Sequence, residues 1–306
     1  MRLTSTHRRR HPRVFRHMTG LTVAEFEELV HDLLPVFTAR EHARLSRPTR
    51  QRAIGGGTPV ALKPREQFLL TVMWLRLYPM HEVLGFLFGV THPTVGRIIQ
   101  RVLPLLEAAG RDTLRLPDPG KKHRRTLDAL LADTPPLAII IDTFEQPVQR
   151  PQDRREADTY YSGKKKQHTH TTQIAVDETT GCVVDVRATV RGPIADLTLR
   201  QQSGLLERLP PDVGSLGDVA YVGMAGLHPQ GLGATPGRKP RGQPRSPEDV
   251  AYNRAFARRR ITVEHSIGRM RWYQALTQRD RHHRQHTGRV CAVAGLVNRC
   301  LERKRR

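Results

Sequence analysis

Apolar residues in the first third of the chain recur at the spacing of amphipathic helices. The segment Leu21–Leu34 carries apolar side chains three and four positions apart, and Thr22 with Glu25 matches the capping box that starts a helix. The same spacing returns over Pro64–Leu77, where proline is tolerated because it occupies the first turn. Residues 50–59 contain three glycines and a proline, so we expect a loop between these helices.

Two shorter helical patterns follow directly. Residues 80–88 and a stretch beginning at 91 or 92 have apolar faces on either side of Gly89, and Pro104 is expected to kink or stop the second helix. Two helices joined by a tight turn that contains glycine are typical of a helix-turn-helix. The polar face of the second helix supplies the candidate DNA contacts: Thr94, Arg97 and Arg101.

The pattern becomes that of a mixed α/β domain after an aperiodic linker over 111–136, which is interrupted by a short helix near 126–131. Residues 137–141 form a continuous apolar run, which indicates a strand buried on both faces and ended by Asp142. Further strands are predicted over 172–177, 182–190 and 213–218, the first two as a hairpin, with a loop over 222–247. Helices are predicted over 194–209, 248–274 and 285–303.

The net charge of the chain indicates which kind of partner it binds. The 306 residues include 51 Lys and Arg against 29 Asp and Glu, and a formal net charge of +22 attracts a polyanion whatever its sequence. We therefore expect nucleic acid as the partner, with the basic residues 1–20 as a flexible arm. Apolar runs are too short for a membrane span and no secretory signal is evident, so a cytoplasmic protein is expected. The three cysteines are too scattered for a disulfide framework or a metal site.

Three carboxylates are the candidates for chemistry. Asp142 and Asp218 each end a predicted strand, and Glu264 lies in the predicted helix 248–274. Adjacent strand ends bring side chains together, and carboxylates held close together repel one another unless a hard divalent cation neutralises them. Two Mg²⁺ ions, with Mn²⁺ as the alternative, then suit in-line attack on a phosphodiester. Taken alone, an aspartate after a strand is more often a turn or helix-cap residue, and a glutamate on a basic helix is more often a solvated partner of a neighbouring arginine.

Taken with their neighbours, these residues resemble a DDE-type transposase of a bacterial insertion sequence, of the Harbinger-like branch that carries a helix-turn-helix. The resemblance covers about residues 20–300, and the joint order of its motifs is more specific than any one of them. The matching segments are Leu21–Phe26, Arg52–Gly57, Ile140–Thr143, Gln146–Pro151, Tyr160–His168, Gly192–Asp196, Gly217–Tyr221, Lys239–Gly242, Asn253–Arg254 and Arg260–His265.

The resemblance implies a helical DNA-binding domain over 21–125 and a ribonuclease-H-like catalytic domain over 126–306. Asp142, Asp218 and Glu264 would be the metal-binding catalytic triad, cleaving DNA at the ends of the element and transferring strands into a target. Relatives often have Arg at the position of Arg260, which this chain keeps, and Lys where Arg271 stands. The tyrosine that the family places just before this motif is replaced by Ala257. A homo-oligomer that brings two ends together, associated with the bacterial nucleoid, is implied as well.

Other basic groups have less specific interpretations. The run Lys164, Lys165 and Lys166 follows two tyrosines and suits backbone phosphates, as do Arg260 and Arg271. The histidines at 168, 170, 282, 283 and 286 lack a matching partner set, so we interpret them as surface residues. Three alternatives stay open: a decayed or domesticated relative that binds DNA without cutting, a helix-turn-helix regulator, and a site-specific nuclease without strand transfer.

Overall fold

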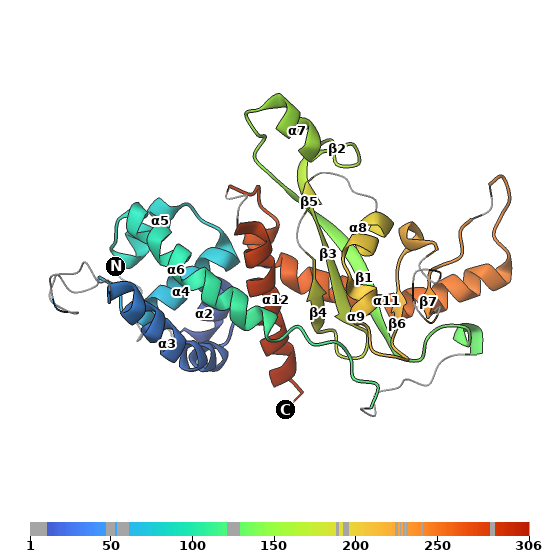
Figure 1. Ribbon diagram of the computed structural model, residues 1–306, viewed down its shortest axis with the longest axis horizontal. Helices are drawn as coiled ribbons and strands as arrows, with labels where there is room; N and C mark the ends of the chain where they lie inside the picture. Colours follow the sequence, from blue (N-terminus) through green and yellow to red (C-terminus); the bar gives the residue numbers. More distant parts are fainter. Residues whose placement is uncertain are drawn as a thin grey trace.

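The chain folds into a helical part and a sheet-containing part, with one helix between them (Figure 1). This computed structural model describes residues 11–46, 53, 61–120, 129–187, 190–191, 196–223, 226, 228, 230, 232–239, 241–281 and 285–305. The expected loop over 50–59, apart from residue 53, and the histidines at 282 and 283 lie outside the described residues. None of the described helices is long and apolar enough to cross a membrane.

Among the described residues, five helices make up the N-terminal part. They are α2 (Pro12–Thr19), α3 (Val23–Leu45), α4 (Pro64–Leu77), α5 (His81–Phe88) and α6 (His92–Arg111). The predicted capping box is present, since the Thr22 side chain accepts from the Glu25 backbone and the Glu25 side chain accepts from the Thr22 backbone. Gly89 ends α5 in the left-handed conformation, with φ of 68°. The helix-turn-helix is therefore formed by α5 and α6.

Two expectations for this part are wrong. Residues 12–19 of the supposed arm form helix α2, because Phe15 is buried against Phe26 with ring centroids 5.5 Å apart. Residues 1–10 of that arm lie outside the described residues. Helix α6 also runs through Pro104 without stopping, since the proline ring lies on the solvent-exposed side of the helix. The cost of the missing N–H is offset by the apolar face that the continuous helix buries.

A mixed sheet forms the centre of the second part. Its strands are β1 (Ala138–Pro147), β2 (Tyr161–Ser162), β3 (Gln167–Asp177), β4 (Val183–Val186), β5 (Val190–Arg191), β6 (Gly214–Leu216) and β7 (Gly233–Ala234). The order β2-β3-β1-β6-β7 places β1 centrally, antiparallel to β3 and parallel to β6. The predicted hairpin turn lies between β3 and β4, while β7 falls within the expected loop over 222–247.

Helices surround this sheet. They are α7 (Arg154–Tyr160), α8 (Asp196–Gln202), α9 (Leu205–Arg208), α11 (Pro247–Arg271) and α12 (His286–Arg303), with short 3-10 turns η1 (Ala129–Leu131), η2 (Val219–Tyr221) and η3 (Gln274–Leu276). The helix expected over 194–209 is two shorter helices, and α7 was not expected from the sequence. The predicted fold class is confirmed: the chain is mixed α/β, with helices followed by a curled sheet, consistent with a ribonuclease-H-like fold.

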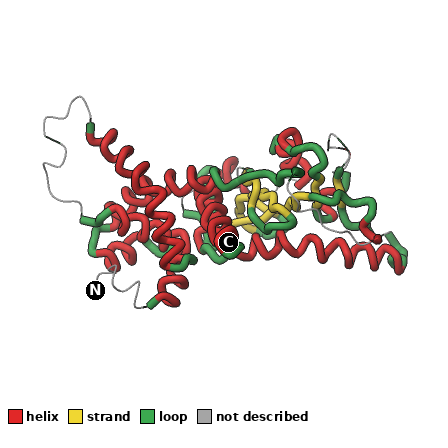
Figure 2. The backbone as a smooth tube through the Cα atoms, turned by 90° about the horizontal axis from the view of Figure 1, so that it is seen from below, coloured by secondary structure: helices red, strands yellow, loops and turns green. Residues whose placement is uncertain are grey.

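The two faces of β1 belong to different cores. Ala138 and Ile140 join the large core that includes Val263 of α11, whereas Ile139 and Ile141 pack with Tyr221 in a smaller core on the other face. Figure 2 shows α11 running along one side of the sheet. Because side chains alternate along a strand, Asp142 projects on the same face as Ile140, toward α11.

Helix α12 joins the two parts, although it follows the whole sheet in sequence. It packs against α6 on one side and against β4 and α11 on the other (Figure 1). The contact with α6 is close because two glycines meet: a Cβ at Gly295 would lie 2.3 Å from the Cα of Gly110. Helix α12 therefore packs on both parts, and the domain boundary that we predicted near 125 stays a prediction.

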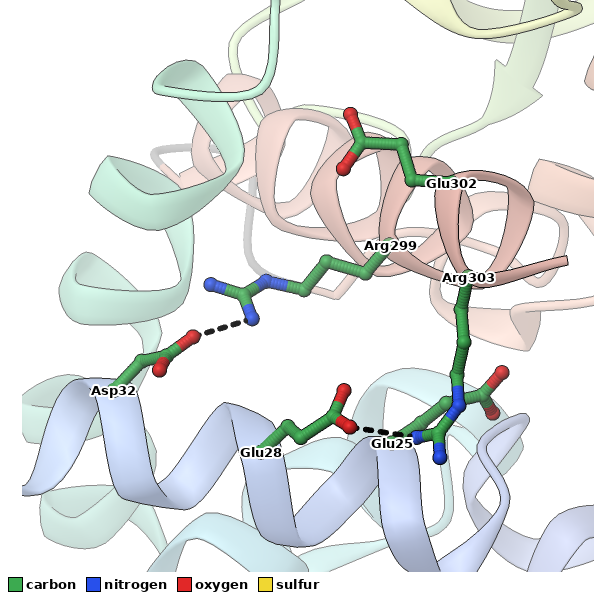
Figure 3. A pocket seen from close by; sticks show the side chains of 6 residues that line it. All are labelled: Glu25, Glu28, Asp32, Arg299, Glu302 and Arg303. Carbon is green, nitrogen blue, oxygen red and sulfur yellow. Dashed lines mark hydrogen bonds and ion pairs between the residues drawn. The ribbon is translucent and has the colours of Figure 1, made fainter. Parts of the chain in front are cut away.

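Charged side chains line a second, more open contact of α12. A cavity of about 660 Å³ between α3 and α12 is lined by Glu25, Glu28, Asp32, Arg299, Glu302 and Arg303 (Figure 3). Arg299 donates to Asp32 at 2.7 Å, and the Arg303 guanidinium lies 3.0 Å from Glu28. These exposed ion pairs are each worth at most about 1 kcal/mol, so the glycine contact and the apolar core hold α12 in place.

A buried polar cluster lies where the two parts meet. Asp280, which is fully buried, accepts from Arg289 of α12 and lies 3.4 Å from the Nδ1 atom of His286. His170 of β3 stacks on His286 with ring centroids 4.8 Å apart, and the Tyr78 hydroxyl of the helical part is 3.5 Å from Asp280. Burial raises the pKa of Tyr78. The interpretation of His170 and His286 as surface residues is therefore wrong.

Candidate active site

Asp142 lies in the middle of β1, on the face that α11 covers. Its Oδ1 atom accepts from the backbone N–H of Thr143 at 2.8 Å, and its side chain is 20% exposed. The strand was expected to end at this residue, but it continues to Pro147 because β3 pairs with it along its whole length. Asp142 is therefore paired with Ile174 of β3, which fixes the backbone that carries its carboxylate.

Glu264 of α11 lines the same pocket as Asp142. The pocket has a volume of about 380 Å³, and Lys164, Lys165 and Arg271 add positive charge to its wall. Its complete lining is Asp142, Thr143, Phe144, Glu145, Lys164, Lys165, Glu264, Ile267, Gly268 and Arg271. The structure thus brings together two of the three predicted acids and three of the predicted phosphate-binding cations, which come from β1, the turn after β2 and α11.

Asp218 lies just beyond the end of β6, the parallel neighbour of β1. The last paired residues are Ile140 and Leu216, so extending the register by two positions sets Asp218 level with Asp142. In this structure the Asp218 carboxylate caps η2 by accepting from the Ala220 backbone at 2.8 Å. Asp218 does not line the pocket that holds the other two acids.

The donor set fits a hard divalent cation, although it is not gathered as a complete cage. Asp142 and Glu264 supply carboxylate oxygens in one pocket, and Asp218 follows the end of the neighbouring strand β6 by two residues. Among the described residues, no group of three or more His, Cys, Asp or Glu side chains is close enough to hold a metal ion. Asp218 would have to turn away from η2 to join the other two carboxylates.

Two neighbouring arginines of α11 have different surroundings. Arg259 is buried, donates to both oxygens of Glu178 in the hairpin turn, and also donates to Thr134 and to the carbonyl of Pro135. Sequence reasoning did not identify this buried pair, which fixes α11 against the sheet. Arg260 instead approaches Asp142, with its Nη2 atom 3.5 Å from Oδ2.

One pocket residue was missed. Glu145 follows Asp142 by three positions in β1, lines the pocket and accepts from the Thr169 hydroxyl at 2.8 Å. The sequence signal was its place in the strand that carries Asp142, which became visible only once β1 was seen to extend past that residue. Lys166 has φ of 51° in the turn before β3 and does not line the pocket.

The helix-turn-helix presents only part of the predicted face. Arg97 of α6 is exposed, whereas the Thr94 hydroxyl is paired with that of Thr91 at 3.0 Å. Arg101 donates to Glu41 of α3 at 3.2 Å and therefore braces the helical part. Burial raises the pKa of Glu41, but hydrogen bonds and charges from Arg44 and Arg101 outweigh it and lower the pKa overall. Of the three predicted contacts, Arg97 is exposed and the other two are half-buried, and all three stay predictions.

The cysteines are small side chains without a role in the pocket. Cys182 and Cys291 are buried and Cys300 is half-buried, and all three are free thiols. Burial raises the pKa of Cys291 to about 11 and that of Cys300 to about 12. Thiols that stay protonated at neutral pH are poor nucleophiles, which agrees with the prediction that they pack as apolar residues.

Comparison with known families identifies this arrangement. Residues 141–298, which contain Asp142, Asp218 and Glu264, match the family described as DDE superfamily endonuclease. The chain belongs to this family. Residues 60–112, which contain α4, α5 and α6, match the family described as helix-turn-helix of DDE superfamily endonuclease. The predicted membership and the predicted helix-turn-helix are both confirmed.

A curated relative extends the match to most of the chain. This DDE superfamily endonuclease is 27% identical over 234 residues to the probable transposase for insertion sequence element IS702 of Microchaete diplosiphon. The aligned region covers 76% of this chain and 79% of the relative. No solved structure matches the chain.

Proposed function

We propose that the protein is a transposase that binds the ends of an insertion sequence, hydrolyses phosphodiester bonds there and transfers the freed strands to a target. The observation that carries the proposal is the pocket in which Asp142 and Glu264 face Lys164, Lys165 and Arg271. DNA cleavage of this kind requires two sets of groups at one place: carboxylates that bind divalent metal ions, and basic side chains that bind the phosphates of the DNA.

The residues of the pocket have distinct roles in this proposal. Asp142, Asp218 and Glu264 would hold two divalent cations, Mg²⁺ or Mn²⁺. When bound, these ions supply activation of a water or of a 3′-hydroxyl and stabilisation of the leaving oxygen. Lys164, Lys165 and Lys166 would bind the DNA backbone on one side of the scissile phosphate, and Arg271 of α11 would orient it from the other.

The helix-turn-helix would read the ends of the element. Recognition by such a motif uses the first residues of its second helix in the major groove, which is where the exposed Arg97 stands in α6. Two element ends and a target must meet in one complex during transposition. We propose that a homo-oligomer assembles this complex on double-stranded DNA.

Replacing Arg97 with alanine is expected to weaken binding to the element ends by about 1–3 kcal/mol, because an exposed arginine in the recognition helix is lost. Arg101→Ala should weaken specific binding less and lower the free energy of unfolding instead, since Arg101 pairs with Glu41. Fluorescence anisotropy with a labelled end duplex, alongside urea unfolding, measures both quantities. Equal losses of DNA affinity in the two variants would contradict the assignment of Arg97.

Product analysis on end-labelled DNA tests the proposed function directly. The native protein is incubated with a duplex that carries the element's own ends and a supercoiled target, in Mg²⁺, Mn²⁺ or EDTA. Nicking that requires a metal, together with joined products, is expected from a transposase. Nicking without joining would instead indicate a site-specific nuclease. Tight binding without cleavage under either metal would indicate a decayed relative or a regulator.

A further inference from the structure

Arg260 does not line the candidate pocket but contacts one of the carboxylates that do. Its guanidinium Nη2 atom is 3.5 Å from Oδ2 of Asp142, where a cation bound to that carboxylate would approach. Both side chains are mostly buried, at 15% and 20% exposure. A positive group thus already neutralises the aspartate without a metal ion.

The contact is weak, as shown by comparison with the preceding residue. Arg259 uses two of its nitrogens on Glu178 and a third on Thr134, all within hydrogen-bonding distance. Arg260 reaches Asp142 through one nitrogen at the limit of hydrogen-bonding distance, and its buried Nε makes no hydrogen bond among the described residues. A guanidinium that contacts a carboxylate through only one of its nitrogens leaves its other N–H donors unused in that ion pair.

The carboxylates around Arg260 explain why a weakly bound guanidinium is useful at this position. Asp142, Glu145 and Glu264 line one pocket, and carboxylates at close range repel one another when no cation lies between them. Arg260 is one helical turn before Glu264 on α11, so its side chain starts beside the pocket. Release from Asp142 therefore requires only rotation about side-chain bonds, without movement of the helix.

We propose that Arg260 is an exchangeable counter-ion that occupies the Asp142 carboxylate in the free protein and gives it up when a divalent cation binds. The released guanidinium then binds a phosphate of the DNA, so that metal entry and DNA engagement favour each other. This inference rests on the proposed function, because it assumes that Asp142 is a metal ligand. It makes Arg260 a positioning residue that keeps the pocket from taking up metal before DNA is present.

Calorimetric titration of the DNA-free, full-length protein with Mn²⁺ tests the competition. Arg260→Ala and Arg260→Gln are expected to bind Mn²⁺ about tenfold more tightly than the native protein, because the metal no longer displaces a guanidinium. Arg258→Ala is the matched control, since it removes an exposed arginine from the same helix. Arg271→Ala removes a pocket cation that is farther along α11 and should raise affinity less than Arg260→Ala does.

A second measurement tests the contact between Arg260 and Asp142 in the absence of metal ions. Urea unfolding in EDTA of Arg260→Gln, Asp142→Asn and the double variant should show non-additive losses, whereas Arg271→Ala combined with Asp142→Asn should be additive. Additive losses in both cycles, or Mn²⁺ affinity of Arg260→Gln equal to that of Arg258→Ala, would overturn the inference and leave the proposed function standing. If no variant binds Mn²⁺ at all, both the inference and the metal-dependent mechanism fail.

Discussion

Replacing Asp142, Asp218 or Glu264 with alanine, one residue at a time, is expected to reduce strand cleavage by at least about 10³-fold. Metal ions contribute several kcal/mol to stabilising a phosphodiester transition state, and each 1.36 kcal/mol is worth about tenfold in rate. DNA affinity should be preserved, because Arg97 lies in the other part of the chain. Single-turnover cleavage of end-labelled DNA, with anisotropy as the binding readout, measures both effects.

A matched acid separates loss of a ligand from loss of charge. Glu248→Ala removes an exposed carboxylate from the first turn of α11, the same helix that carries Glu264. It should cleave at the native rate. Cleavage at the native rate by any of the three acid variants would remove that residue from the triad. Asp218 is the most informative of the three, since it reaches the pocket only by leaving η2.

The variant Asp280→Ala should lower the free energy of unfolding by about 3–5 kcal/mol, the largest stability loss that we expect from one substitution in this protein. In the native protein the Asp280 carboxylate accepts from Arg289, and both side chains are fully buried. Removing the acid leaves the guanidinium buried without its counter-charge and removes a neighbour of Tyr78 and His286. Equilibrium unfolding in urea measures the loss.

An exposed ion pair of the same chemistry is the control. Asp32→Ala breaks the pair with Arg299, whose side chains are 49% and 28% exposed, and should cost at most about 1 kcal/mol. Asp280→Asn keeps the shape of the side chain and should fall between the two variants. A loss for Asp280→Ala no greater than that for Asp32→Ala would show that the buried cluster does not stabilise the fold.

Local patterns were sufficient for most of the helices. Thr22 with Glu25, Pro64 and Gly89 each mark a helix terminus through interactions that span only a few residues, and the structure has helix ends at each of them. Pro104 misled the prediction because the effect of a proline depends on which side of the helix is buried. Part of that burial comes from α12, which packs on α6 and follows Pro104 by almost two hundred residues.

The strands were less predictable, because pairing sets their length. The continuous apolar run ends at Ile141, yet β1 continues to Pro147 since β3 supplies partners for its more polar half. The same holds for the polar cluster: His170 lies more than a hundred residues before Asp280 and His286, and no local spacing indicates that it meets them. Long-range contacts, rather than composition, bury these side chains.

At the candidate site, too, the sequence identified residues, while their arrangement depended on long-range contacts. Asp142, Asp218 and Glu264 were selected by the order of motifs in a family resemblance, which specifies residues but not their positions in space. The structure places Asp142 and Glu264 in one pocket and turns Asp218 toward η2. The direction of Arg260 toward Asp142 depends on how α11 lies across the sheet, which Arg259 and Glu178 determine.

The close packing of α12 on α6 has a consequence for how the protein is made. Helix α12 is translated after every strand of the sheet, so α6 emerges from the ribosome long before its packing partner exists. The glycine contact between Gly110 and Gly295 and the shared apolar core cannot form until that synthesis is done. A nascent chain therefore carries α6 without its full support, and the packing of the helix-turn-helix is complete only after the residues of the candidate site have been translated.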